Sequence, residues 1–581
     1  MHRPMPLAVL FTSLLATLSS AAEKPNVVLI ITDDQGYGDI AAQGNPVLRT
    51  PNLDMLFRQS VRLTDYHVDP TCAPTRSALM SGRYSTRVGV WHTINGRSLL
   101  PGEELTLAEV FQANGYRTAM FGKWHLGENY PCRPQDQGFE HVICHGGGGV
   151  SQGPDYLGND YFDDTYLVNG EWRKFEGYCT DVWFREALKF IEQKKEKPFF
   201  VYLSTNAPHA PLNVEERYAE PYREKGVPPA MSKFYGMIEN IDENLGRLRA
   251  RLEELGLAEN TLLIFTTDNG TTIGHFDRGS GYEFFNAGMR GIKGTAYEGG
   301  HRVPFFLHWT KGGLTGVKDI DMLCEQIDVL PTLTELLQLE KPAGKPLDGI
   351  SLAPAIAGNA EALPERTLFA HVQREYVLPK WTRSSTMTER WRLIDGAELY
   401  DIVADPGQQK DIAAAHPEVV AELRAEYEKW WKSLEPGFSE VVRYGLGGGQ
   451  NPMTLHSHDW LFNGFAVWNQ PDIHNSKLIN GPFMVQVEQA GTYRITPMRW
   501  PEYLDRPSGC VKAAVSVTYG PAASGESGTF EQAIELDPKK PAQPLTLKLP
   551  AGPASLLTTL TRPDGKTFGG YYVKIERVEG E

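Results

Sequence analysis

The stretch NVVLIITDDQG, residues 26–36, decides the fold, because a run of consecutive apolar residues ends there at two adjacent aspartates. An uninterrupted apolar run rich in valine and isoleucine is typical of a strand buried on both faces of a parallel sheet. Further runs of the same kind are TAMFG (118–122), FFVYLST (199–205), TLLIFTT (261–267) and VPFFLHW (303–309). Together these runs predict a sheet with several buried strands.

Helix-like segments alternate with the predicted strands. EELTLAEVFQANG (103–115) and SKFYGMIENIDENLGRLRARLEELG (232–256) carry apolar residues at helical spacing and end in glycine, which is a helix-stop signal. Short buried strands that alternate with helices favour the α/β class. We therefore predict an α/β domain with a doubly wound mixed sheet over residues 23–359.

Two smaller units are expected after this domain. Residues 360–436 contain RWRLI and ELYDI as short strands and then an amphipathic helix, which together predict a small antiparallel sheet with one covering helix. The glycine-rich run GLGGGQNP indicates a linker over 437–452. From 453 to 581, segments such as AAVSVTYG alternate apolar and polar residues with a period of two, as in an all-β sandwich.

The N-terminus and the overall charge limit where the protein acts and on what. An apolar run from Leu7 to Leu18, followed by Ser20-Ala21-Ala22, predicts a signal peptide over 1–22 and a secreted or periplasmic protein. No later apolar run is long enough to span a membrane. The formal net charge of −15 argues against a nucleic-acid partner.

Two of the predicted strands end in acidic pairs, Asp33-Asp34 and Asp268-Asn269. In doubly wound sheets the functional groups gather beyond the carboxyl ends of the strands, so we expect these two tips to meet. Three carboxylates and an amide oxygen are hard donors, which suit Ca²⁺ better than Zn²⁺ or copper. The alternative is that both pairs are turn formers before glycine.

Basic groups follow other strand ends. TAMFGKWHLG supplies Lys123 and His125, FFVYLSTNAPHAP supplies His209, and the glycine-rich GMRGIKGTAYEGG supplies Lys293. Each of them taken alone fits a solvated lysine or an ordinary histidine. Together they would place cations on the side of the sheet where the carboxylates would hold a metal.

The segment CAPTRSALMSGR, residues 72–83, contains one of six cysteines, which are too few for a disulfide scaffold and lack zinc-like spacing. Pro74 suits the first position of a helix and Gly82 suits its end, so Cys72 is expected just before a helix N-terminus. That end attracts anions, and Arg76 one turn later adds a planar fork for a tetrahedral oxyanion. A buried free cysteine or a half-cystine is the alternative.

These motifs together resemble the type I sulfatases of the alkaline-phosphatase superfamily. CAPTRSALMSGR matches the Cys-x-Pro-x-Arg signature of that family, with Thr75 where serine is most frequent. Further blocks match in the expected order: GYRTAMFGKWHLG, APHAP, TTDNG and RGIKGTAYEGGHRVPF. The resemblance covers about residues 24–435, and several ordered motifs make it specific.

The resemblance implies a modified residue and a metal ion. Cys72 would be converted to Cα-formylglycine by a separate maturation enzyme, and a second hydroxyl on that residue would allow sulfate to be expelled. The implied Ca²⁺ ligands are residue 72 with Asp33, Asp34, Asp268 and Asn269. The implied catalytic groups around residue 72 are Arg76, Lys123, His125, His209 and Lys293. His209 would protonate the departing alcohol, and His125 would help to deprotonate the second hydroxyl.

Export and the appended sandwich favour a sulfated carbohydrate as the substrate. A formylglycine-dependent phosphonate or phosphodiester hydrolase on the same fold is one alternative, and a catalytically silent glycan-binding protein is another. Candidate substrate residues come from the segments VWHTINGRS, TTIGHFDRGSGYEFF and EGGHRVP. They are His92, Arg97, His275, Arg278 and His301, each of which also fits a solvated loop residue.

Overall fold

The computed structural model describes residues 24–194, 196–276, 279–372, 374–520 and 527–578. The predicted signal peptide and Arg278 lie outside the described residues. Within the described part of the chain, no helix is both long and apolar enough to cross a membrane.

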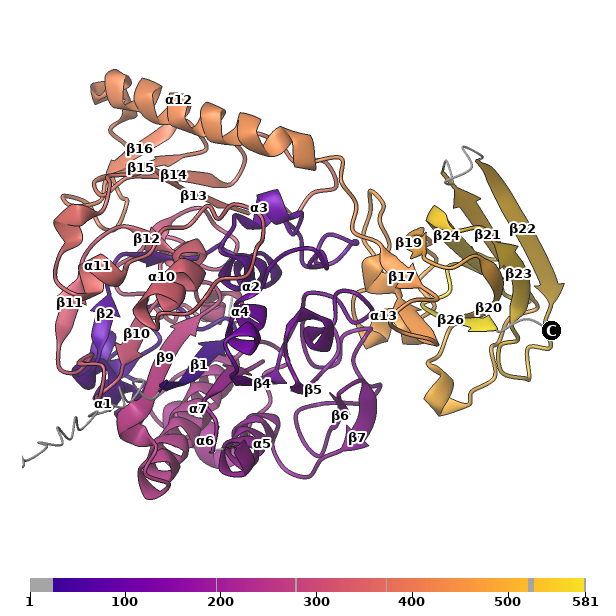
Figure 1. The fold of residues 1–581 in the computed structure, drawn as a ribbon, viewed down its shortest axis with the longest axis horizontal. Coiled ribbons are helices and arrows are strands. Elements are labelled where there is room, and N and C mark those ends of the chain that lie inside the picture. Colours follow the sequence, from indigo (N-terminus) through magenta and orange to yellow (C-terminus); the bar gives the residue numbers. More distant parts are fainter. Residues whose placement is uncertain (1–23, 195, 277–278, 373, 521–526, 579–581) are drawn as a thin grey trace, which may run out of the picture.

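A large mixed sheet forms the centre of the N-terminal part (Figure 1). Its strands lie in the order β11 (Lys318–Ile320), β2 (Val61–Leu63), β10 (Phe305–His308), β9 (Thr261–Thr267), β1 (Asn26–Thr32), β8 (Phe199–Ser204), β4 (Arg117–Gly122), β5 (His141–Cys144), β6 (Thr165–Val168) and β7 (Glu171–Lys174). Strands β9, β1, β8, β4 and β5 are parallel, whereas β10 is antiparallel to β9. Every apolar run predicted as a strand lies in this sheet, which confirms the α/β prediction.

Helices cover both faces of the sheet, because the central strands bury side chains on both sides. On β1, Val27, Leu29 and Ile31 point into one core, and Val28 and Ile30 point into the other. The first core includes residues of α2 (Cys72–Ser81), α4 (Leu107–Ala113) and α10 (Val329–Leu336). The second includes residues of α1 (Pro51–Gln59), α5 (Cys179–Lys194) and α7 (Pro229–Glu254).

The C-terminal subdomain matches the sequence prediction. An antiparallel sheet contains β13 (Leu368–His371), β14 (Ser384–Met387), β15 (Trp391–Ile394) and β16 (Glu398–Asp401). Helix α12 (Pro417–Leu434) lies along it at the top of Figure 1. Tyr427, Trp430 and Trp431 of α12 are buried in a core shared with Leu368 and Met387 of the sheet.

The last part of the chain is a sandwich of two antiparallel-rich sheets. One contains β17 (Tyr444–Leu446), β19 (Phe483–Val487), β24 (Gly552–Thr561), β21 (Lys512–Tyr519) and β22 (Gly528–Glu535). The other contains β18 (Met453–His456), β26 (Tyr572–Val578), β20 (Gly491–Met498) and β23 (Leu545–Leu549). The segment 437–452, expected as a linker, supplies the buried strand β17, because Tyr444 and Leu446 flank a single glycine and pair with β19.

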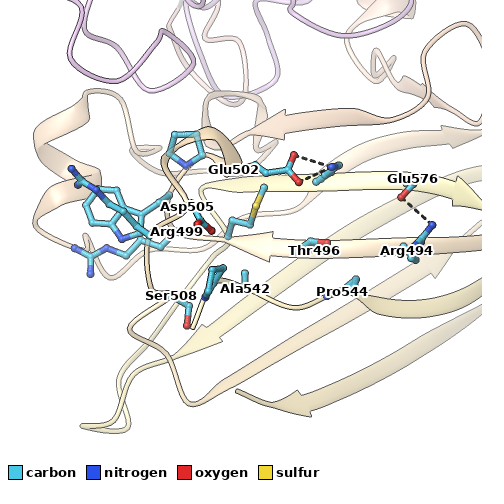
Figure 2. A pocket seen from close by; sticks show the side chains of 15 residues that line it. Arg494, Thr496, Arg499, Glu502, Asp505, Ser508, Ala542, Pro544 and Glu576 are labelled. Atoms are coloured by element: carbon cyan, nitrogen blue, oxygen red, sulfur yellow. Dashed lines mark hydrogen bonds and ion pairs between the residues drawn. The ribbon is translucent and has the colours of Figure 1, made fainter. Parts of the chain in front are cut away.

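The sandwich packs directly on the N-terminal α/β part. Asn95 N–H donates to His458 O at 2.7 Å, and Tyr572 Oη donates to Gly153 O at 2.8 Å. A groove of about 300 Å³ lies on the outer side of β20 and β26 (Figure 2). In this groove the half-buried Trp500 has Arg499 and Arg506 within 4.5 and 5.1 Å of its ring centroid.

Candidate active site

Loops from neighbouring strand ends meet at the carboxyl edge of the sheet. Asp33 N–H donates to Ala207 O at 3.2 Å, which links the loops after β1 and β8. Asp268 N–H donates to Thr32 O at 3.1 Å, and Lys123 N–H donates to Ser204 O at 2.8 Å. The expected meeting of the two acidic tips therefore takes place, and the loop after β4 joins them.

The backbone is held in unusual conformations at this edge. Asp34 has φ 69° and His125 has φ 62°, a left-handed region that costs energy for residues other than glycine. At Gly122, φ 110°, an added Cβ would lie 1.8 Å from Ser204 O, so only glycine fits. Strained residues of this kind persist where the surrounding structure fixes them, often at functional sites.

Cys72 lies at the start of α2 and is 2% exposed. The helix begins at Cys72 itself rather than just after it, and Pro74 occupies the first turn, where its missing N–H has no cost. Gly82 ends the helix with φ 66°, as predicted. Burial alone would raise the pKa of the Cys72 thiol, but the nearby Lys123 and Lys293 outweigh it and lower that pKa.

Three acids surround Cys72, and each has a cationic partner. Lys123 Nζ lies 2.7 Å from Asp33 Oδ2. The Arg76 guanidinium donates to Asp268 Oδ2 at 2.7 and 3.0 Å. In addition, Lys293 forms an ion pair with Asp34.

The donor atoms fit the calcium ion that the family resemblance implies. Single ligand atoms of Asp33, Cys72 and Asp268 lie within 4.8 Å of one another. Asp33 Oδ1 and Asn269 Oδ1 are buried without a hydrogen-bond partner among the described residues. Burial and then the neighbouring Asp268 raise the pKa of Asp33 well above its usual range. A hard divalent cation would satisfy the orphaned oxygens and would favour the ionised form of Asp33.

Two histidines present a ring nitrogen to the same space. His125 Nε2 is 2.8 Å from Thr93 O and must donate to it, so Nδ1 is the unprotonated nitrogen, which is buried without a partner among the described residues. His209 Nδ1 likewise donates to Ala210 O at 2.6 Å, and its Nε2 lies 3.8 Å from Asp34 Oδ2. Burial lowers the pKa of both rings, to about 4 for His209.

The candidate substrate residues differ in their positions. His92 is buried near the site, and its Nδ1 accepts from the N–H groups of Thr93 and Ile94 at 2.8 and 3.0 Å. Arg97 stacks on the Trp91 ring at 4.1 Å and donates to Glu440 O at 2.6 Å, so its guanidinium is engaged by the protein. His275 is exposed on α8 (Ile273–Phe276).

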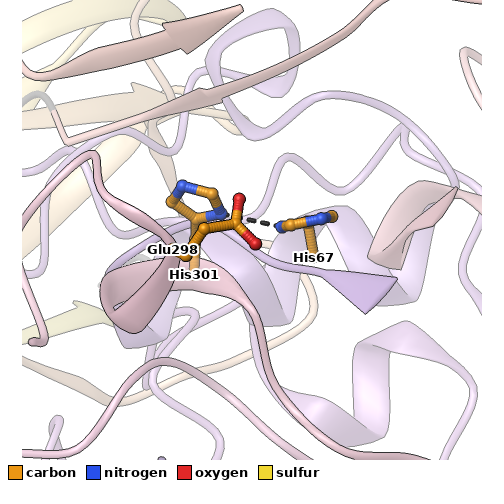
Figure 3. Close-up of side chains that lie close together, drawn as sticks. All are labelled: His67, Glu298 and His301. Atoms are coloured by element: carbon orange, nitrogen blue, oxygen red, sulfur yellow. Dashed lines mark hydrogen bonds between the residues drawn. The ribbon is translucent and has the colours of Figure 1, made fainter. Parts of the chain in front are cut away.

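His301, a candidate substrate residue, lies in the interior of the protein. The residue is fully buried in α9 (Glu298–His301), with Nδ1 2.8 Å from His67 Nδ1 and Nε2 3.1 Å from Ala296 O (Figure 3). Both ring nitrogens are therefore used inside the protein. The sequence EGGHRVP gave no sign of this, because His67 lies in a distant segment.

Ligand atoms of His67, Glu298 and His301 lie close enough for one metal ion. The positive charge at this place is already supplied by arginine, because Arg392 Nε lies 2.7 Å from Glu298 Oε1 and Arg392 Nη2 lies 3.0 Å from Asp65 Oδ1. Because Arg392 belongs to β15, its ion pairs with Asp65 and Glu298 connect the C-terminal subdomain to the N-terminal α/β part. We name the set His67, Asp65, Glu298, His301 and Arg392 the buried network.

Some groups at the site were missed by sequence reasoning. Ser204, at the end of β8, accepts a hydrogen bond from Arg76 Nη1. An added Cβ on Gly148 would lie 2.3 Å from the His125 ring, and one on Gly149 would lie 3.2 Å from the His209 ring. The run HGGGGV, residues 145–150, was the available signal, since repeated glycine often marks close backbone approach.

Comparison with known proteins agrees with this geometry. The family model described as Sulfatase matches residues 25–339. Human arylsulfatase A is 31% identical over 79% of this chain and 98% of its own length, and pig N-acetylgalactosamine-6-sulfatase is 28% identical over 64% and 74%. The crystal structure of Ps i-CgsB in complex with k-i-k-neocarrahexaose has a TM-score of 0.62 and 27% identity, covering 70% of this chain and 93% of that one.

The family model covers more than half of the chain, and the human relative extends over most of it. The mixed sheet with its C-terminal antiparallel subdomain is the fold of these relatives. The chain therefore belongs to the formylglycine-dependent sulfatase family of the alkaline-phosphatase superfamily and is a sulfuric ester hydrolase.

Proposed function

We propose that this enzyme removes sulfate from a sulfated carbohydrate, with a formylglycine made from Cys72 by a maturation enzyme and with a bound Ca²⁺. The observation that carries the proposal is the open acidic cluster beside Cys72, in which Asp33 Oδ1 and Asn269 Oδ1 lack partners among the described residues. Asp33, Asp34, Asp268 and Asn269 would hold the ion. When present, the formylglycine supplies a hydroxyl nucleophile and Ca²⁺ supplies charge for the sulfate oxygens.

The cationic side chains would bind and orient the sulfate ester. Lys123 and Lys293 lie close enough to Cys72 to lower the pKa of its thiol, so their charges also reach a sulfate bound next to it. Arg76 is fixed between Asp268, Ser204 and the backbone carbonyl of Lys123 and adds fixed positive charge below the site. Such preorganised charge stabilises a transition state without reorganisation.

The histidines would move protons in opposite directions. His209 Nε2 points toward the site, and a proton held there would pass to the oxygen of the departing alcohol. Burial lowers the pKa of His209 to about 4, but the negative charge of a bound sulfate ester favours the protonated ring. His125, with its free Nδ1, would accept a proton from residue 72 when sulfate leaves.

The carbohydrate class rests on several supports. One relative is named N-acetylgalactosamine-6-sulfatase, and one similar structure holds a neocarrahexaose. The predicted signal peptide indicates a secreted or periplasmic enzyme, and sulfated carbohydrates occur outside the cell. A phosphonate or phosphodiester hydrolase remains the second candidate, because a phosphoryl group is also a tetrahedral oxyanion for this site.

Two experiments test the proposal. Mass spectrometry of the peptide containing residue 72, from protein co-expressed with the maturation system, should show the aldehyde in place of the thiol; an unmodified cysteine in active enzyme would contradict it. Paired assays on sulfate and phosphate esters of the same sugar should show release of sulfate only. A folded Cys72→Ser variant should lose sustained turnover, because a sulfated serine has no second hydroxyl with which to expel sulfate.

A further inference from the structure

Arg374, which the proposed mechanism does not use, lies beside the catalytic pocket. It follows β13 in the C-terminal subdomain, and its backbone N–H donates to Trp91 O at 3.0 Å. Trp91 Nε1 in turn donates to Glu375 O at 3.1 Å, so two hydrogen bonds hold this dipeptide on the indole. Two residues after Trp91, the carbonyl of Thr93 accepts from His125. The same short loop therefore positions both Arg374 and His125.

The backbone of Arg374 has φ 44°, a left-handed conformation that an arginine adopts only where contacts impose it. The hydrogen bonds to Trp91 are those contacts. The guanidinium lies close enough to Cys72 and Asp34 for their charges to act on it. Lys293 and His92 are also within reach of its charge.

The guanidinium of Arg374 has no protein partner among the described residues. Its Nε is buried without a hydrogen bond, and burial lowers the pKa of the group, with Cys72 and Asp34 acting in the opposite direction. An unpaired buried donor is costly, and a cation with five N–H groups is an ideal receptor for a planar or tetrahedral anion. The Arg374 guanidinium is therefore available to bind an anionic ligand.

His92 adds a neutral donor on the same side. Its Nδ1 accepts from two backbone N–H groups, so the ring proton must be on Nε2. Burial and then the charge of Arg374 lower the pKa of His92 to about 3, so this ring stays neutral. Asn95 and Gly96, in the same loop, both donate to His458 O of the sandwich, which braces the loop from behind.

We propose that Arg374, with His92 beside it, binds a second anionic group, sulfate or carboxylate, that the substrate carries next to the scissile sulfate ester. The proposal deepens the carbohydrate function above and rests on it. The scissile sulfate is served by groups from the strand ends, whereas Arg374 enters from the C-terminal subdomain. The residue thus selects multiply charged saccharides over singly charged ones.

The test compares substrates that differ by one anionic group. One pair is a monosaccharide with a single sulfate and the same sugar with a second sulfate on a neighbouring carbon. Another pair is a sulfated disaccharide with a neutral sugar or a uronic acid as its second unit. We expect the wild-type kcat/KM to be about tenfold or more higher for the doubly charged member of at least one pair, mostly because its KM is lower. A tenfold ratio corresponds to a free-energy difference of ~1.4 kcal/mol.

Variants then assign the preference. Arg374→Gln should bring the ratio of kcat/KM values within a pair close to one, and Arg374→Lys should keep part of it as a point charge. The matched control is Arg383→Gln, because Arg383 is a nearby arginine already bound to Glu375 at 3.0 Å. This control should keep the wild-type ratio. A wild-type ratio near one in every pair, or an unchanged ratio in Arg374→Gln, would overturn the proposal.

A further pair of substrates tests the role of Arg374 even if the proposed carbohydrate function is wrong. If wild type desulfates no saccharide, the carbohydrate proposal is wrong. Aryl sulfates with and without an ortho carboxylate then decide the role of Arg374. A preference for the carboxylated ester that Arg374→Gln removes supports the inference, and no preference overturns it.

Discussion

Two buried clusters of this protein contain the same residue types but have different roles, one in the proposed active site and one in the structure. The acidic cluster around Cys72 and the buried network around His67 both combine carboxylates, histidines and arginine. In the network, Arg392 and other cations lower the pKa of Glu298 to about 2 in spite of its burial. In the acidic cluster, burial and Asp268 raise the pKa of Asp33. The surroundings of Glu298 favour its ionised form, and those of Asp33 disfavour it.

The difference teaches how a working site is recognised. A closed ion network contributes to the assembly of the fold, because Arg392 pairs with both Asp65 and Glu298. An open cluster keeps oxygens such as Asp33 Oδ1 and a ring nitrogen such as His125 Nδ1 without partners among the described residues, which costs stability unless a ligand arrives. Unsatisfied groups therefore indicate a site where they lie among residues that could bind a metal ion, as they do beside Cys72.

The largest expected effect is on the open cluster. Asp33→Asn should lower kcat/KM by about 10³-fold to 10⁴-fold, because several kcal/mol of metal-based charge stabilisation are lost. In the presence of a chelator, the same variant should melt at the wild-type temperature or above, since the ionised Asp33 is disfavoured in the folded protein. Calorimetry of Ca²⁺ binding with thermal melting checks both effects. Full activity with undiminished Ca²⁺ binding would contradict the metal assignment.

In the buried network we expect the reverse result, a loss of stability with little change in activity. Arg392→Met leaves Glu298 and Asp65 buried without their main partner, so we expect a loss of about 3–5 kcal/mol in the free energy of unfolding. Activity per folded molecule should change little. The control is Arg390→Met, two residues earlier, where the arginine is 61% exposed and its pair with Asp401 should contribute little. Equal stability losses for both variants would remove the distinction.

The histidines offer a smaller contrast at similar size and burial. His125→Gln should reduce kcat about 10²-fold, at the lower end of proton-transfer catalysis, because it removes the free Nδ1. His301→Gln should leave kcat within a few-fold and lower the melting temperature, because both of its nitrogens are bonded internally. Steady-state rates on one saccharide sulfate, with melting curves, measure both. A His301→Gln variant that lost activity but not stability would return His301 to the pocket.

The sequence predicted the parts of the site that lie at strand ends. Asp33, Asp268 and Lys123 follow buried apolar runs, and the topology of a parallel sheet brings such ends together. Arg374 and His301 could not be placed in this way. Arg374 depends on a loop docked onto Trp91, and His301 depends on a partner more than two hundred residues away, His67. Contacts between distant loops are set by tertiary packing, which no local pattern encodes.

The segment 437–452, expected as a linker, contains a strand that local composition did not indicate. Glycine-rich composition indicated a linker, yet Tyr444 and Leu446 alternate around Gly445 and are buried in the sandwich. Three residues are too few for a periodic signal. The strand forms because β19 offers an unpaired edge, a tertiary cause that is invisible in the sequence.

The smallest expected effect on the open cluster comes from a substitution in the glycine run HGGGGV, residues 145–150. Gly148→Ala would place a Cβ 2.3 Å from the His125 ring, so the ring must shift while its bond to Thr93 O resists. Because displacements of about 1 Å in a catalytic group cost up to ~10²-fold, we expect a loss of about tenfold in kcat. The control is Gly437→Ala, whose Cβ would lie 3.8 Å from Arg87 O, an ordinary van der Waals contact, so this variant should match wild type. The Ca²⁺ affinity of Gly148→Ala, measured alongside, should stay unchanged because the His125 ring is not among the proposed ligands. A full rate in this variant would show that the position of the ring does not limit turnover.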